Sequence, residues 1–175
     1  MEAQKVIQKF LKTAYDFSSV QLEIPDPEAE EIRKWGKQNI PENLLVDKGL
    51  EDDIHITIKY GIHIYDFTEA RNLFINQKPI KLKLGKISLF NGDCDVVKIE
   101  VNSPDLHRLN KLISNKLEVT DTHPVYYPHL TLAYVLKSFG DQFDGKTDFL
   151  GREIVCDSVV FSGKDNRKTL FKLNA

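Results

Sequence analysis

Apolar and polar residues alternate in several short stretches of this 175-residue chain, and a period of two is typical of half-buried β-strands. The clearest example begins at Ser19, where Val20, Leu22 and Ile24 share one side and polar residues occupy the other. Alternating or strongly β-prone runs predict further strands over residues 54–60, 80–90, 95–101, 127–135, 154–161 and 169–173.

Other stretches place apolar residues three or four positions apart, which predicts amphipathic helices. Asp26-Pro27 opens one helix, with an acidic first turn, Ile32 and Trp35 on its inward side and an end near Gly36. Further helices are predicted over residues 3–15, after Asp66 or Thr68, and from Ser103-Pro104 onward.

The connections between these elements indicate the fold class. Asn91-Gly92-Asp93 separates two alternating runs, which is a strong hairpin signal, whereas residues 137–149 are rich in Gly, Asp and Lys and predict a loop. Strands joined by hairpins and mixed with three or four helices favour an antiparallel α+β fold over a doubly wound parallel sheet. The length favours a single domain, residues 1–175, built from two lobes.

One short signature occurs twice, nearly half the chain apart: His55-Ile56-Thr57 and His129-Leu130-Thr131. Side chains two residues apart in a strand point to the same face, so each histidine shares a face with its threonine while the aliphatic neighbours pack the other way. The repetition predicts a duplicated half with pseudo-two-fold symmetry, and two such strands facing each other across a central cleft.

Two imidazoles and two hydroxyl groups around one point are the set that metal-independent cleavage of a phosphodiester requires. One neutral imidazole takes the proton of the attacking oxygen, while the other, as imidazolium, protonates the leaving oxygen. The threonine hydroxyls can donate to the non-bridging phosphate oxygens, where negative charge grows in the transition state. His55, Thr57, His129 and Thr131 are therefore the predicted catalytic residues. The alternative is that both pairs are ordinary polar residues on sheet faces.

Charge and composition narrow the range of partners. The formal net charge of −2 argues against binding of long nucleic acid, but not against a small anion held by local donors. The chain has no run of about 18 apolar residues and no signal-peptide pattern, so we expect a cytoplasmic protein without membrane contact. Cys94 and Cys156 are expected to be free thiols. No HExxH or other metal-ligand spacing is present, so neither a metal nor another cofactor is expected.

The paired His-x-Thr signature resembles that of the 2H phosphoesterase superfamily, which includes LigT-like RNA ligases and cyclic phosphodiesterases. The resemblance covers about residues 18–173 and implies antiparallel sheets with flanking helices, arranged as two lobes around a cleft. The segment Ser18-Ser19-Val20-Gln21, with the runs 55–61 and 129–134, is similar to phage anti-CBASS phosphoesterases. This narrower resemblance implies cleavage of cyclic oligonucleotide messengers of bacterial immunity, such as cGAMP, in the cytoplasm of the host.

Four further residues are candidates for contact with the substrate: Tyr127, Tyr15, Trp35 and Lys59. Tyr127 lies two positions before His129 and is expected to share its face. Tyr15 is the candidate for an N-terminal tyrosine that the anti-CBASS resemblance implies, and Trp35 could stack on a base. Lys59 could bind phosphate. Packing in the core is the alternative for Tyr15 and Trp35, and a place on the surface is the alternative for Lys59.

Tyr60 and Tyr134 each follow their histidine by five residues. This odd offset predicts that both tyrosines face away from the cleft and pack within the lobes, unless a β-bulge intervenes.

The sequence leaves two alternatives to cleavage of a cyclic oligonucleotide. One is RNA-end processing, in which the same four residues would open 2′,3′-cyclic phosphates or handle 2′–5′ linkages. The other is a sponge that binds a nucleotide without cutting it. Also left open are the nucleotide, the histidine that acts as base, viral or bacterial origin, and the oligomeric state.

Overall fold

The computed structural model describes residues 15–123 and 125–174, and its strands form two sheets. The four-stranded sheet has the order β3 (His55–Ile62), β1 (Ser18–Glu23), β8 (Ser158–Ser162) and β9 (Lys168–Lys172). The five-stranded sheet has the order β2 (Leu45–Leu50), β6 (His129–Val135), β5 (Asp95–Asn102), β4 (Ile80–Asn91) and β7 (Glu153–Cys156). The pairings within both sheets are antiparallel, which confirms the predicted α+β class.

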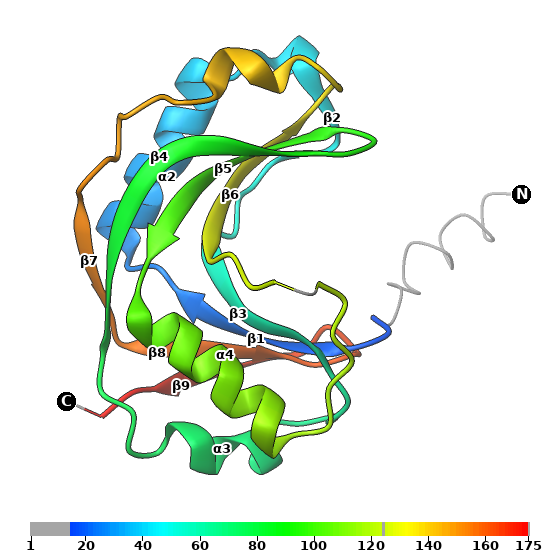
Figure 1. The fold of residues 1–175 in the computed structure, drawn as a ribbon, viewed down its shortest axis with the longest axis vertical. Helices are drawn as coiled ribbons and strands as arrows, with labels where there is room; N and C mark the ends of the chain where they lie inside the picture. Colours follow the sequence, from blue (N-terminus) through cyan, green and yellow to red (C-terminus); the bar gives the residue numbers. More distant parts are fainter. Residues whose placement is uncertain (1–14, 124, 175) are drawn as a thin grey trace, which may run out of the picture.

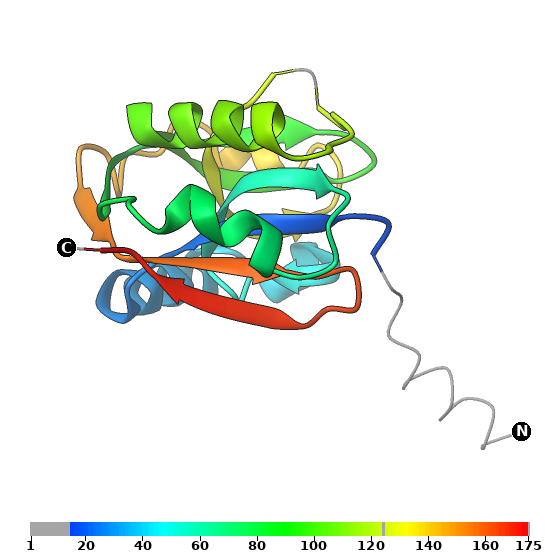
Figure 2. The ribbon, with the colours of Figure 1, turned by 90° about the horizontal axis from the view of Figure 1, so that it is seen from below.

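The helices cover the sheets from outside. In the described residues they are α2 (Asp26–Asn39), α3 (Thr68–Phe74) and α4 (Pro104–Lys116), with 3₁₀ turns η1 (Glu42–Leu44) and η2 (Gly140–Phe143). Helix α2 contacts β2 and β6, whereas α4 contacts β3, β4 and α3. The two sheets curl toward each other, and β3 and β6 lie next to each other where the sheets meet (Figure 1). Seen from below, β3, β1, β8 and β9 follow one another in that order away from α4 (Figure 2).

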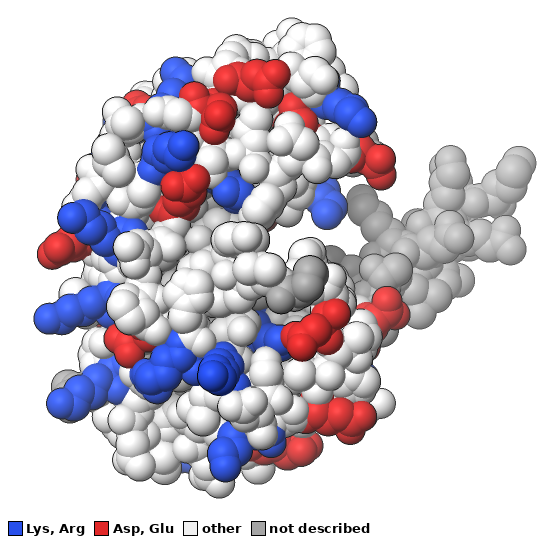
Figure 3. Space-filling view, in the orientation of Figure 1, with Lys and Arg blue, Asp and Glu red and all other residues white. Residues whose placement is uncertain are grey.

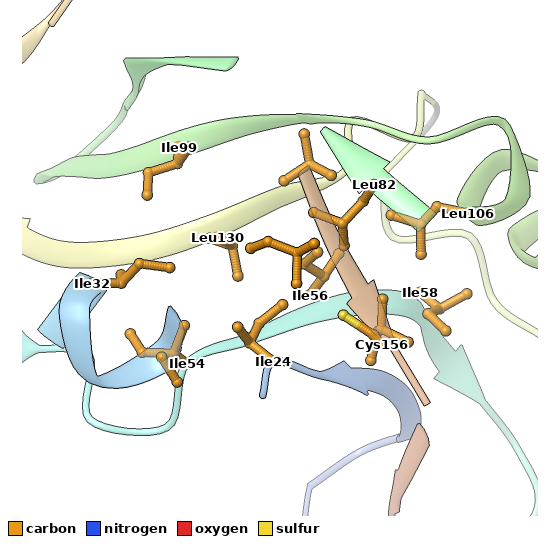
Figure 4. Packing of buried hydrophobic residues seen from close by; sticks show 14 of the residues in the cluster. Ile24, Ile32, Ile54, Ile56, Ile58, Leu82, Ile99, Leu106, Leu130 and Cys156 are labelled. Atoms are coloured by element: carbon orange, nitrogen blue, oxygen red, sulfur yellow. The ribbon is translucent and has the colours of Figure 1, made fainter. Parts of the chain in front are cut away.

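The hydrophobic core lies behind the strands that carry the two signatures. Ile56 and Ile58 of β3 and Leu130 of β6 are almost completely buried, and they belong to one cluster with residues of both sheets (Figure 4). Full burial of each such side chain contributes roughly 1.5–3 kcal/mol, so the two strands are held firmly from behind. Cys156 lies in this cluster as a free thiol, and Cys94 is also free.

The structure corrects several predicted boundaries. The strand predicted over residues 154–161 is two strands, because the chain leaves β7 at Asp157 and enters β8 in the other sheet. Helix α2 does not end at Gly36 but continues to Asn39, since Gly36 is buried within it against Leu50. Strand β2 was not predicted, and β6 begins at His129. Apart from Tyr15, the helix predicted over residues 3–15 lies outside the described residues.

None of the helices in the described part of the chain combines the length and the apolarity needed to cross a membrane.

Candidate active site

The two signature histidines are oriented by the same hydrogen bond. His55 Nδ1 lies 2.6 Å from the carbonyl oxygen of Asp53, and His129 Nδ1 lies 2.7 Å from the carbonyl oxygen of Tyr127. Because a carbonyl oxygen only accepts, Nδ1 carries the hydrogen in both rings. Nε2 is therefore the nitrogen that each ring leaves available for proton transfer.

The aliphatic residues of each signature hold the polar ones on the opposite face. Ile56 is buried completely, whereas His55 and Thr57 on either side of it are partly exposed. In the same way Leu130 is buried between His129 and Thr131. We call the face that carries these four polar residues the cleft face of each sheet. The alternation predicted from the sequence is thus confirmed over both signatures.

The fold brings the two signatures together. Strands β3 and β6 contact each other although they belong to different sheets. The Tyr126 hydroxyl, just before β6, donates a hydrogen bond of 3.0 Å to the carbonyl oxygen of Thr57 in β3. His55 and His129 are close enough that the positive charge of His55 contributes to lowering the pKa of His129. Figure 3 shows a hollow in this face of the molecule, with both charged and uncharged residues around it.

The electrostatic surroundings of the two histidines differ. Burial lowers the pKa of His129 below 6.5, and the nearby cations Lys98, His55 and His123 lower it further, whereas the hydrogen bond to the Tyr127 carbonyl acts in the opposite direction. His55 instead has a carboxylate beside it, because the Oδ2 of Asp53 lies 3.9 Å from its Nδ1. The neutral imidazole is therefore favoured at His129, the form that a general base requires.

A β-bulge follows each signature at the same position. The pairing of β1 with β3 shifts by one residue between Thr57 and Lys59, and the pairing of β5 with β6 shifts between Thr131 and Ala133. Each extra residue reverses the alternation beyond it. Tyr60 pairs with Ser19 on the cleft face, as does Tyr134 with Val96 in the other sheet. Both tyrosines therefore turn toward the cleft, and the expectation for regular strands does not hold.

The bulge in β3 also places Lys59 where it cannot have the expected role of binding phosphate. Lys59 pairs with Val20, a core residue, so it lies on the face opposite to His55. Its side chain is almost buried, and the ammonium forms an ion pair with Asp121. Lys59 is a structural cation on the helix-covered side of β3, not a substrate contact.

Trp35 is also removed from the cleft. Its ring is buried in α2 and packs edge-on against Phe149, and its Nε1 donates a hydrogen bond of 2.9 Å to Asp148. The alternative interpretation of Trp35 as a core residue is therefore correct.

The remaining two expected substrate contacts are accessible. Tyr127 is exposed in the coil before β6 and supplies the carbonyl that orients His129. Tyr15 is half-exposed, and its backbone N–H donates to the carbonyl of Lys164 in the turn between β8 and β9.

A pocket of about 240 Å³ adjoins His55 on the cleft face of the four-stranded sheet. Its walls combine aliphatic and polar side chains from β1, β8, β9 and the segment before β3: Gln21, Glu23, Asp53, Val160, Lys168 and Leu170. Within residues 15–123 and 125–174, no group of three or more His, Cys, Asp or Glu is arranged to hold a metal ion.

Comparison with known proteins identifies the family. The model of the family described as Anti-CBASS protein Acb1 matches residues 18–166, most of the chain. The chain belongs to this family. No curated protein sequence matches it.

Solved structures show the same fold in distant relatives. TT0787 of Thermus thermophilus is 13% identical with a TM-score of 0.58, and the alignment covers 90% of this chain and 95% of that chain. Usb1 of Kluyveromyces marxianus is 9% identical with a TM-score of 0.59, covering 91% and 99%. LigT of E. coli, complexed with 3′-AMP, is 16% identical with a TM-score of 0.59, covering 90% and 94%. The Acb1 family member is thus a phosphodiesterase with the LigT-like 2H fold, as the signature predicted.

Two residues of the cleft face were not found from the sequence of this Acb1 family member. The ring of Phe90 in β4 stands edge-on to His129, with 4.9 Å between ring centroids. Lys98 in β5 is nearly buried, and its ammonium lies 4.3 Å from the centre of the Phe90 ring. Both are positioned by the pairing of β4, β5 and β6, and no local motif marks them.

Proposed function

We propose that this protein cleaves a 3′–5′ phosphodiester bond of a small cyclic oligonucleotide messenger, with His55, Thr57, His129 and Thr131 as the catalytic residues. One observation carries the proposal: two equivalent His–Thr pairs on adjoining strands, with both Nδ1 atoms tied to carbonyls so that both Nε2 atoms are left for proton transfer. Membership of the Acb1 family supports the choice of substrate class.

The reaction follows from the different surroundings of the two rings. His129, whose pKa is lowered by burial and nearby cations, takes the proton from the 2′-hydroxyl of the substrate. The 2′-oxygen forms a bond to phosphorus while the bond from phosphorus to the 5′-oxygen breaks. His55 donates its Nε2 proton to that 5′-oxygen, and the product carries a 2′,3′-cyclic phosphate. The hydroxyl groups of Thr57 and Thr131 donate to the non-bridging oxygens as their charge grows.

The pocket beside His55 suits a nucleobase on the leaving-group side. Val160 and Leu170 offer apolar contact to the face of a base, while Gln21 and Glu23 offer hydrogen-bonding groups to its edge. A pocket of about 240 Å³ offers room for one nucleobase of a small nucleotide, and the net charge of −2 argues against a long strand. With such a substrate, we infer a cytoplasmic location, in the cytoplasm of the host if the protein is viral.

The test is turnover of a panel of cyclic di- and trinucleotides and of an RNA with a 2′,3′-cyclic end, in EDTA. We expect a cyclic ribo-oligonucleotide to be consumed by the wild type, and by neither His55→Ala nor His129→Ala. The matching cyclic di-deoxynucleotide should be inert, because it lacks the attacking hydroxyl. Its efficient cleavage would contradict the mechanism.

The same panel separates the other candidate functions. Turnover of the RNA end alone would move the protein to RNA processing with the same four residues. Stable binding of a cyclic oligonucleotide that is recovered unaltered would identify a sponge.

A further inference from the structure

The strands beside the two signatures carry the same residue opposite each histidine but different residues opposite each threonine. Strand β1 places Glu23 opposite His55 and Gln21 opposite Thr57. Strand β5 places Glu100 opposite His129, but opposite Thr131 it places Lys98 instead of an amide. Opposite the signature threonines, the His129 side thus carries a positive charge where the His55 side carries an amide.

Lys98 is an unusual lysine. Its side chain is only 6% exposed, yet it lies on the cleft face together with Thr131. Its ammonium donates one hydrogen bond, of 2.6 Å, to the Ser88 hydroxyl, and it lies over the ring of Phe90. No carboxylate lies within 4.0 Å of it in the described part of the chain; Glu100 and Asp144 act on it only from farther away. Burial of the ammonium lowers the pKa of Lys98.

A nearly buried ammonium without an anionic partner is costly, because its lost hydration is not replaced. Lys59, which is also nearly buried, has such a partner in Asp121. An ammonium has three N–H donors, and Ser88 accepts from only one of them. The Phe90 ring offsets part of the cost but cannot accept a directed charge-assisted hydrogen bond.

We propose that Lys98 binds the phosphate of the substrate on the His129 side of the cleft, donating to a non-bridging oxygen beside Thr131. This inference rests on the proposed function for its substrate. Lys98 supplies the positive charge that hydroxyl groups lack, at the place where negative charge grows during cleavage. Ser88 holds the ammonium, and Phe90 fills the space between it and the His129 ring. The matching position on the His55 side carries the uncharged amide of Gln21, so the phosphate is held off-centre, toward His129.

The inference is tested by binding, which does not depend on turnover. The affinity of 3′-AMP and of adenosine is measured by calorimetry, and that of inorganic phosphate by NMR titration. The proteins are the wild type, Lys98→Met, Lys98→Arg and Ser88→Ala. Lys111→Met is the control, because it removes an exposed lysine of α4 and changes the net charge equally. Thermal unfolding establishes that each variant is folded.

We expect Lys98→Met to weaken 3′-AMP binding by about ten- to a hundredfold, the effect of losing one charge-assisted hydrogen bond. Adenosine binding should not change, and inorganic phosphate should no longer bind measurably. Lys98→Arg should retain most of the affinity for 3′-AMP, Ser88→Ala should lose a smaller part, and Lys111→Met should match the wild type. If Lys98→Met does not fold, the 3′-AMP affinities of Lys98→Arg and Ser88→Ala still test the inference.

Equal 3′-AMP affinity in the wild type, Lys98→Met and Ser88→Ala would overturn the inference and leave Lys98 a structural cation. Failure of the wild type to bind either 3′-AMP or inorganic phosphate would overturn it as well. Lys98-dependent binding of 3′-AMP without turnover of any substrate would support the anion site and contradict the proposed function. Turnover that is lost in His129→Ala but unchanged in Lys98→Met would support the proposed function and contradict the role of Lys98 in binding the phosphate.

Discussion

Tyr134 lies on the same face of β6 as Thr131, although the two residues are three positions apart. The bulge between Thr131 and Ala133 makes this possible, and the equivalent bulge of β3 does the same for Tyr60 and Thr57. The symmetric placement of a bulge after each His-x-Thr pair gives the cleft two aromatic side chains with polar tips. The ring of Tyr134 also lies 4.7 Å below the ammonium of Lys48 in β2.

Replacement of Tyr134 by alanine is expected to weaken substrate binding. Stacking of a base on an aromatic side chain contributes about 1–3 kcal/mol, so kcat/KM should fall roughly five- to 150-fold. Unfolding free energy should change little, because the ring is only half-buried. Tyr65→Ala is the matched control, since Tyr65 is exposed beside Lys164 and away from β6. Equal kcat/KM values for Tyr134→Ala and Tyr65→Ala would show that Tyr134 does not contact the substrate.

The bulges also explain which residues could be assigned to a face from the sequence and which could not. The shared face of His55 with Thr57, and of His129 with Thr131, could be predicted because a period of two holds across each signature and needs no knowledge of the neighbouring strand. Lys59 was wrongly expected to contact the substrate, and Tyr60 was assigned to the wrong face, because a bulge is a property of two paired strands. Nothing in one strand's alternation reports the extra residue.

Contacts that depend on the register between paired strands could not be predicted from the sequence for the same reason. The hairpin of β4 and β5 was predicted, but the pairing of Lys98 with Ser88 on one side and with Thr131 on the other depends on the register of three strands. The division of residues 154–161 into β7 and β8 depends on a change of sheet at Asp157. Both strands carry apolar residues, so their composition gives no sign of the change.

The pH dependence of kcat/KM should report His129 on its acidic side. Its pKa is below the ordinary value of 6.5, chiefly through burial and then through Lys98 and other cations, so the neutral base persists at lower pH. The acid limb is therefore expected below pH 6.5. Removing the charge in Lys98→Met raises the pKa of His129, and the limb should shift to higher pH. A limb that stays in place or shifts to lower pH in this variant would show that Lys98 does not act on the base.

Trp35→Ala is expected to destabilise the protein without affecting catalysis. Loss of a buried tryptophan typically costs about 3–5 kcal/mol, and here it also leaves Asp148 without its donor. Urea unfolding measures the loss, and kcat/KM is measured at a temperature where the variant is folded. Asp148→Asn keeps the ring in place and should cost only about 1 kcal/mol. A fall in kcat/KM for folded Trp35→Ala would contradict this prediction and support a role for Trp35 in stacking on a nucleobase.

Gly61→Ala should be far more destabilising than Gly49→Ala, although both glycines have positive φ. Gly61 has a φ of +91°, and a Cβ atom there would lie 2.0 Å from the carbonyl oxygen of Thr120. Gly49 has a φ of +66° with open space around it. Backbone strain alone costs roughly 1–2 kcal/mol, which is the loss expected for Gly49→Ala. Gly61→Ala must in addition push away the segment whose Thr120 N–H donates to the Gly61 carbonyl, so its loss should exceed about 3 kcal/mol. Unfolding in urea compares the two variants directly, and equal losses would mean that this segment moves aside freely and does not brace the end of β3.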